Sequence, residues 1–320
     1  MTLKRFLIAT PVAVVLLLAG LSFGPSGQSP VVRIAGMIIP SATPTATDTA
    51  TPTATATPTN TPTETPTPTL TPTITPTPLP TRDPNLRVAR VPILMYHYIS
   101  VPPPDADKYR LDLSVTPDNL DAQMAYLAAH GYHTIRVEDL TSYLLHGTPA
   151  LPPKPIVLTF DDGYVDNYQN ALPILRKYKF TATFFIITQF IDDHRPGYLT
   201  WDQVEEMAIE GMEIGSHTLD HVDLYGKPRA YQVTQIDGSK LMIESRIGTP
   251  VKSFCYPSGK FDLRTISVLR SGGYLGATTE IQGTLQSTAN IYELRRIRIR
   301  GSYSVAEFAH WIDYFMANGR

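Results

Sequence analysis

Residues 156–163 read Ile-Val-Leu-Thr-Phe-Asp-Asp-Gly, a short apolar run that ends in two carboxylates and a glycine. A run of this length, bounded by a turn signal, predicts a buried strand. Successive residues of an ideal strand point to opposite faces. The turn at Gly163 can re-aim them, so Asp161 and Asp162 are expected to serve one site where the strand ends.

Outward from this strand, short apolar runs alternate with segments of helical period, which predicts an α/β fold. One strand-like run, 91–96, ends at His97, and another, 251–256, leads into a Pro-Ser-Gly turn. Capping signals, such as Thr-Pro at 116–117, mark helix starts between the runs. In α/β sheets and barrels, chemistry collects at the carboxyl ends of strands. These ends are therefore where the functional residues are expected.

A second motif, Ser-His-Thr-Leu-Asp-His at 216–221, follows another short apolar run and places two imidazoles four residues apart. Together with Asp162, His217 and His221 offer one carboxylate oxygen and two nitrogens to a divalent metal. Asp161 remains beside them as a spare carboxylate. Three protein ligands with an open position are typical of a catalytic metal site rather than a structural one. The pattern predicts metal-assisted hydrolysis.

Composition divides the 320-residue chain into three segments. Residues 1–25 begin with Lys4 and Arg5 and continue as an apolar run, which predicts a signal peptide or a membrane anchor. Residues 26–85 contain a Thr-Pro array and are expected to form a disordered Thr/Pro-rich linker. Residues 86–320 are long enough for one sizeable domain. The net charge of −2, with no long basic run, argues against a nucleic-acid partner, and the single cysteine, Cys255, excludes an internal disulfide.

Three segments resemble motifs of the NodB-type polysaccharide deacetylases, carbohydrate esterase family 4: residues 159–163, 216–221 and 254–259. The likeness extends over most of 90–300. It implies a distorted (β/α)7-type barrel, the NodB homology domain, which removes N- or O-acetyl groups from carbohydrate with a divalent metal. By this resemblance, Asp161 is the general base, the backbone near Ser258 helps to hold the oxyanion, and the metal ligands are Asp162, His217 and His221.

The sequence also departs from the family pattern. Cys255 stands where many members have an arginine that orients the base, and Arg296 stands where the acid histidine is usual. The fourth motif's Asp and Trp are not visible near 274–283. A subgroup carries the acid histidine on an N-terminal strand, which residues 92–97 resemble. The resemblance therefore assigns His97 as general acid, and we expect Arg296 to replace the missing arginine beside Asp161.

The sequence thus predicts an exported, metal-dependent hydrolase that removes N-acetyl groups from a cell-wall or extracellular GlcNAc polysaccharide. Zinc is the expected metal, with cobalt, nickel or manganese as alternatives. Two other functions stay open, an O-acetyl esterase acting on a polymer such as xylan and a catalytically weak glycan-binding surface protein. We expect a monomer that meets a membrane only through its N-terminal segment. Tyr164 and Tyr256 are candidate walls of the sugar site, although either ring could equally serve packing.

Overall fold

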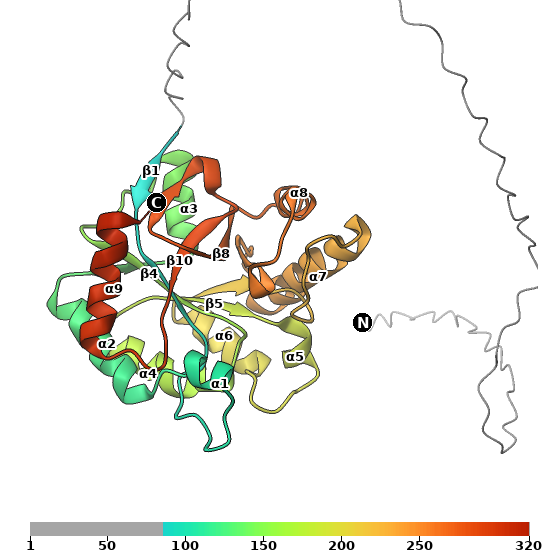
Figure 1. The fold of residues 1–320 in the computed structure, drawn as a ribbon. Helices are drawn as coiled ribbons and strands as arrows, with labels where there is room; N and C mark the ends of the chain where they lie inside the picture. Colours follow the sequence, from blue (N-terminus) through green and yellow to red (C-terminus); the bar gives the residue numbers. More distant parts are fainter. Residues whose placement is uncertain (1–85, 320) are drawn as a thin grey trace, which may run out of the picture. The chain divides into compact units, whose positions relative to one another are not determined.

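A computed structural model describes residues 86–319, so the predicted segments 1–25 and 26–85 lie outside the described residues. Within them, parallel strands pair in the order β2-β10-β8-β7-β6-β5-β4, and β4 pairs again with β2. These seven strands close into a barrel that helices surround (Figure 1). The strands are β2 (Ile93–Tyr96), β4 (Pro155–Phe160), β5 (Thr183–Ile186), β6 (Glu213–Ser216), β7 (Ser253–Cys255), β8 (Gly276–Gln282) and β10 (Leu294–Arg298). The predicted (β/α)7-type barrel is confirmed.

The barrel is irregular around β4, the strand that carries the aspartate motif. β4 pairs with β2 along one side, where Ile93 lies opposite Val157. On its other side β4 pairs first with β3 (His133–Ile135) and then, near its end, with β5. An antiparallel pair, β1 (Val88–Arg90) and β9 (Leu285–Ser287), lies outside this sheet. The sequence did not predict β3, because three residues give too short a pattern to read.

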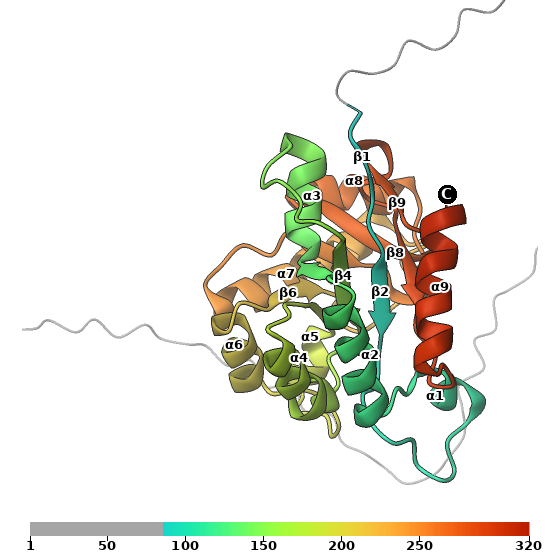
Figure 2. The ribbon, with the colours of Figure 1, turned by 90° about the vertical axis from the view of Figure 1, so that its left-hand side faces the viewer.

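Helices follow the strands and cover the outside of the barrel (Figure 2). Predicted caps begin several of them: Thr116 accepts from Asn119 N–H, and Thr200 and Ser304 each form a capping box. No helix within 86–319 has both the length and the apolar content to cross a membrane. The helices are α1 (Lys108–Leu113), α2 (Pro117–Ala129), α3 (Val137–His146), α4 (Leu172–Tyr178), α5 (Thr188–Asp192), α6 (Trp201–Ile209), α7 (Arg229–Ile247), α8 (Leu263–Ser271) and α9 (Val305–Asn318).

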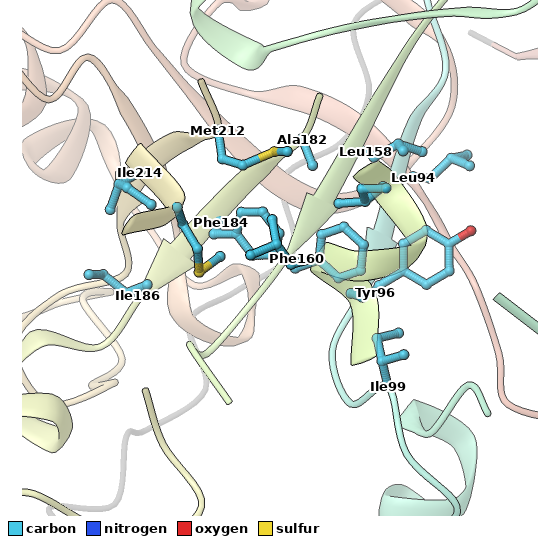
Figure 3. Packing of buried hydrophobic residues seen from close by; sticks show 14 of the residues in the cluster. Leu94, Tyr96, Ile99, Leu158, Phe160, Ala182, Phe184, Ile186, Met212 and Ile214 are labelled. Carbon is cyan, nitrogen blue, oxygen red and sulfur yellow. The ribbon is translucent and has the colours of Figure 1, made fainter. Parts of the chain in front are cut away.

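The outward-facing residues of the strands form the larger core, between the barrel and the helices (Figure 3). At its centre, the Phe160 ring stacks on Tyr96, with centroids 5.2 Å apart, and on Phe184, with centroids 4.8 Å apart. Burying one such ring contributes roughly 2–3 kcal/mol. The apolar residues that alternate along β4 therefore anchor the strand and fix the direction in which its other face points.

The inward-facing residues of the same strands fill the barrel with a second, smaller core that includes Val157, Phe185 and Leu294. Since side chains alternate along a strand, the residue two positions further on also points inward. At the carboxyl ends of β4 and β10, this alternation places the side chains of Asp161 and Arg298 on the inner face of the barrel. The barrel interior therefore changes from apolar to charged as it approaches the edge where the strands end.

Candidate active site

A cavity of about 330 Å³ opens at the carboxyl end of the barrel. Six residues predicted from the sequence line it: His97, Asp161, Asp162, His217, Tyr256 and His221. Ser258 also lines it, on the turn after β7. The predicted gathering of strand-end residues is thus found in one place. The remaining walls come from Tyr109, Leu113, Glu280 and Arg298.

Asp161, which lines this cavity, forms a buried, two-point ion pair with Arg296, which lies behind it. Arg296 Nη1 donates to Asp161 Oδ1 and Nη2 to Oδ2, each at 2.8 Å. The other donors of the guanidinium are also used, by the Thr279 carbonyl (2.9 Å), Thr159 Oγ1 (3.1 Å) and Cys255 Sγ (3.2 Å). Such a fork holds a carboxylate in one orientation. The structure therefore places Arg296 where a group that orients Asp161 must lie.

This pairing also sets the charge of Asp161. Burial by itself raises the pKa of the carboxyl group, but the charge and hydrogen bonds of Arg296 outweigh it and leave the pKa below its ordinary value. Asp161 is 2% exposed and Arg296 is 1% exposed, so water screens this interaction little. Asp161 is consequently an ionised carboxylate, which can accept a proton.

Asp162, His217 and His221 converge on one point beside this pair. The Nε2 atoms of His217 and His221 lie 3.3 Å and 3.4 Å from Asp162 Oδ1. Asp162 and Gly163 each have a positive φ of 75°. This backbone turn directs the Asp162 side chain toward the cavity, although the alternation along β4 alone would point it outward. A positive φ of 55° at His221 likewise ends its loop. As expected from the sequence, the turn brings the side chain of Asp162 to the same site as that of Asp161.

These three residues fit a divalent metal. Asp162 Oδ1 is buried and accepts no hydrogen bond from a described residue, which is costly unless another group binds it. His217 Nδ1 lies 2.8 Å from the Cys255 carbonyl, and a carbonyl only accepts, so Nδ1 carries a hydrogen, and in the neutral imidazole Nε2 is the atom that can bind a metal. The ligand atoms all lie within 4.8 Å of one another. One carboxylate and two imidazoles match the N/O donors of open zinc sites.

His97 faces the same cavity from the end of β2. Its Nε2 lies 3.9 Å from Asp161 Oδ2, and its carbonyl accepts from Asn167 Nδ2 at 2.8 Å. Burial lowers the pKa of His97, and although Asp162 and Asp161 oppose this change, the pKa stays below the ordinary value. His97 is thus a weakly basic imidazole next to the ion pair.

The two tyrosines predicted as sugar contacts lie differently. The hydroxyl of Tyr256 donates to the Tyr292 carbonyl at 2.9 Å and its ring stacks on Phe261, so only part of the ring edge reaches the cavity. Tyr164 lies in a neighbouring hollow, where its ring stacks on Tyr98 with centroids 3.6 Å apart. Both rings pack, and only Tyr256 lines the cavity itself.

Comparison with known proteins agrees with this geometry. The family "Polysaccharide deacetylase" matches residues 148–277. The protein YxkH of Bacillus subtilis, assigned to the polysaccharide deacetylases, is 34% identical over 226 residues, which cover 70% of this chain and 77% of YxkH. The chain belongs to the polysaccharide deacetylases. The resemblance drawn from the three motifs is confirmed.

Two further relatives are a solved structure and an enzyme with a named substrate. The Streptococcus pyogenes deacetylase PplD, solved in complex with acetate, matches with a TM-score of 0.65 and 31% identity, covering 71% of this chain and 99% of PplD. The poly-β-1,6-N-acetyl-D-glucosamine N-deacetylase of Escherichia coli is 24% identical over 62% of this chain and 36% of its own length. The chain therefore spans about a third of that enzyme.

Sequence reasoning missed three kinds of neighbour in the deacetylase site. Glu280 and Arg298 line the cavity from β8 and β10, and the alternation of arginine with isoleucine along β10 was the available signal for Arg298. Cys255 is buried and lies close to the chemistry. Its Sγ contacts Arg296 Nη2 and lies 3.5 Å from Asp161 Oδ2. Tyr109 and Leu113 come from α1, a short helix that no sequence pattern indicated.

Proposed function

We propose that this polysaccharide deacetylase removes N-acetyl groups from a GlcNAc-containing polysaccharide with a divalent metal, zinc by preference. One observation carries the proposal: Asp162, His217 and His221 converge beside a second carboxylate, Asp161, which Arg296 holds ionised. Three protein ligands leave an open position for water or substrate. The adjacent, separately held base is what hydrolysis of an amide requires.

Each of these residues has a separate role in the reaction. Asp162, His217 and His221 hold the metal, which when bound lowers the pKa of water and polarises a carbonyl. Asp161 accepts a proton from the attacking water, and Arg296 keeps its carboxylate aimed at the cavity. His97 donates a proton to the departing amine, because its imidazole exchanges protons near neutral pH. Both proton-transfer groups are side by side, with 3.9 Å between His97 Nε2 and Asp161 Oδ2.

The turn after β7 supplies the remaining feature of acyl-transfer chemistry. Ser258, with φ 53°, faces the cavity, and Gly259 N–H donates to the Tyr256 carbonyl at 3.0 Å, which closes the turn. Backbone N–H groups in a tight turn can stabilise an oxyanion. We assign this role to the backbone at Ser258, with Tyr256 as the wall behind it.

The N-acetyl substrate is supported by a relative. The E. coli protein acts on poly-β-1,6-N-acetyl-D-glucosamine by name, and the likeness extends over 62% of this chain. The neutral surroundings of the metal residues also suit an uncharged sugar, since Arg298 pairs with Glu280 at 3.3 Å. Hydrolysis of an amide needs a group that accepts the proton of water and a group that protonates the leaving amine, and Asp161 and His97 are the candidates for these two roles.

The experiment is acetate release by the full chain, stripped of metal and then supplied with zinc, cobalt, nickel or manganese. β-1,6- and β-1,4-linked GlcNAc oligomers are compared with acetylated xylan. We expect release from a GlcNAc oligomer that requires metal and is fastest with zinc. Release from xylan alone would replace the proposal with an O-acetyl esterase. Metal binding without release from any polymer would support a glycan-binding protein instead.

We also propose that the chain is exported, with 1–25 as signal peptide or anchor, 26–85 as linker and 86–320 as the catalytic domain. The charge pattern of the first 25 residues and the Thr-Pro array support this. A full chain tagged at its C-terminus should be cut by a protease added to intact cells. Protection of the chain until the cells are lysed would contradict export.

A further inference from the structure

A second hollow, of about 340 Å³, adjoins the active-site cavity. Glu280 and Arg298 line both, so these two side chains form the boundary between the two spaces. The far wall is α9, which contacts β10 and lies along the barrel in Figures 1 and 2. The mechanism above uses none of the residues on that wall. The hollow is lined by Glu280, Gln282, Arg298, Arg300, Tyr303, Trp311 and Phe315.

Aromatic rings form the floor of this hollow. The Trp311 ring lies nearly parallel to Tyr303, with centroids 6.3 Å apart and 17° between the planes, and 5.9 Å from the centroid of Phe315. Trp311 and Tyr303 are only partly buried. Pyranose rings present C–H groups on their faces, and these pack against aromatic rings. A broad, partly exposed aromatic surface is therefore suited to one sugar residue.

The charged groups around the floor are paired with one another. Arg298 lies 3.5 Å from Asp112 and 3.3 Å from Glu280, and Arg300 lies 2.8 Å from Asp112. Two arginines and two carboxylates leave no excess charge for an ionic ligand. They still offer hydrogen-bond donors and acceptors at fixed positions, as Gln282 does, and sugar hydroxyls use both.

We propose that this hollow binds an uncharged sugar residue next to the one being deacetylated, with the sugar stacked on Trp311. An oligomer of two or more linked, neutral hexosamine units then fills both spaces, whereas a monosaccharide fills only one. This inference rests on the proposed function, because it extends the same site along its polymer. Trp311 acts in binding and contacts no reacting atom.

Fluorescence tests binding without turnover. The sequence contains two tryptophans, and Trp201 is 7% exposed on α6, away from the hollow. In a chain carrying Trp201→Phe and Asp161→Asn, Trp311 is the sole tryptophan and the base is lost. We expect a GlcNAc tetramer to change the emission of Trp311 and the monomer to leave it unchanged. Unchanged emission with a tetramer at saturating concentration would overturn the proposal.

Kinetics test the same idea in the active chain. Stacking of one ring is worth on the order of a tenfold change in affinity, so Trp311→Ala should raise KM about tenfold more for a tetramer than for the GlcNAc monosaccharide. Trp311→Phe should restore most of the difference, and Tyr231→Ala, on the distant surface of α7, should show none. Equal losses on both lengths would mean a structural role and would overturn the proposal. If no glycan releases acetate but the tetramer still changes the emission, the proposed function fails and the sugar hollow stands.

Discussion

Two buried carboxylates at opposite ends of the barrel behave in opposite ways. Asp161, after β4, is 2% exposed, and Glu213, at the start of β6, is 7% exposed. The pKa of Asp161 is lowered because Arg296 outweighs burial, whereas burial raises the pKa of Glu213 to about 7. Both side chains lie on inward-facing positions. Burial raises the pKa of both carboxyl groups. The presence of a cation beside the carboxylate therefore decides which of the two stays ionised.

The surroundings of Glu213 show how a neutral carboxyl group is built. Its Oε2 accepts from Thr183 Oγ1 at 2.7 Å and from the Glu138 N–H at 3.1 Å. Arg136 and Lys252 lie nearby, but both pair with Glu138, at 2.7 Å and 3.8 Å. Neutral donors suffice where the group only fills space. At the other end, where a base is needed, the buried pair of Asp161 and Arg296 stays charged despite the free energy that its desolvation costs.

The largest expected effect follows from removing the cation from the Asp161 end. Arg296→Ala leaves Asp161 buried and unpaired, which should lower the free energy of unfolding by about 3–5 kcal/mol. In the fraction that folds, kcat should fall by about a hundredfold or more, because the base loses its orientation. Zinc content should stay at the wild-type level, since Arg296 touches none of the metal ligands.

Arg296→Lys is the matched control for that change. Lysine keeps the positive charge but cannot form the two-point contact. We expect it to recover most of the stability and little of kcat, with KM nearly unchanged. If Arg296→Lys had wild-type kcat, orientation would be unimportant, and Arg296 would supply charge alone.

The next effect in size concerns His97. His97→Gln keeps a polar side chain of similar reach but removes the proton donor, so kcat/KM should fall by about a hundredfold. The pKa of His97 is lowered, so the wild-type rate should decline on the alkaline side from a pH below the ordinary histidine value. In His97→Gln this alkaline decline should vanish, as a pH–rate profile would record. A variant that kept both the rate and the alkaline decline would remove His97 from the mechanism.

A smaller effect is expected at the opposite end. The folded chain holds the Glu213 proton up to about pH 7, and the unfolded chain loses it near 4.5. Between these values the folded state binds more protons, so stability falls as pH rises. Glu213→Gln should be near neutral at pH 4.5 and more stable than wild type by about 3 kcal/mol at pH 8. Denaturant unfolding at both pH values measures this. A pH-independent difference would mean that folding does not raise the pKa of Glu213.

The smallest expected change removes one donor from Glu213. Thr183→Val keeps the shape of the side chain but deletes the 2.7 Å hydrogen bond to Glu213 and the 3.1 Å hydrogen bond that Thr183 Oγ1 accepts from Val137 N–H. The free energy of unfolding should fall by about 2 kcal/mol. Acetate release should be unaffected, because the change lies at the amino end of the barrel. A loss of activity comparable to that of Arg296→Lys would show that the two ends are coupled.

The sequence predicted the carboxyl end of the barrel better than the amino end. Strands 156–160 and 212–215 were visible because they are apolar runs bounded by turn signals, and the aspartates and histidines follow them directly. Glu213 gave no signal, since a single acidic residue within a short apolar run looks like a strand edge. Its burial depends on β3, whose three residues are too short a pattern to recognise, and on α3, which was not predicted from the sequence.

The ion pair shows where sequence reasoning reached its limit. Arg296 was proposed as a partner of Asp161 because a family position lacked its usual residue, and the two positions are 135 residues apart in the chain. The guanidinium also bonds Thr159, Thr279 and Cys255, which no motif connects. Contacts of this kind exist only once β4, β7, β8 and β10 are neighbours in a closed barrel.

We assign different roles to two adjacent residues, with Asp161 as the base and Asp162 as a metal ligand. One paired measurement tests this difference most directly. Asp161→Asn and Asp162→Asn are prepared as full chains, and bound zinc and acetate release from a GlcNAc oligomer are measured for each. We expect Asp161→Asn to keep one zinc per chain and lose acetate release, and Asp162→Asn to lose both. Zinc lost from Asp161→Asn, or acetate release retained by it, would contradict the assignment of Asp161 as the base beside the metal.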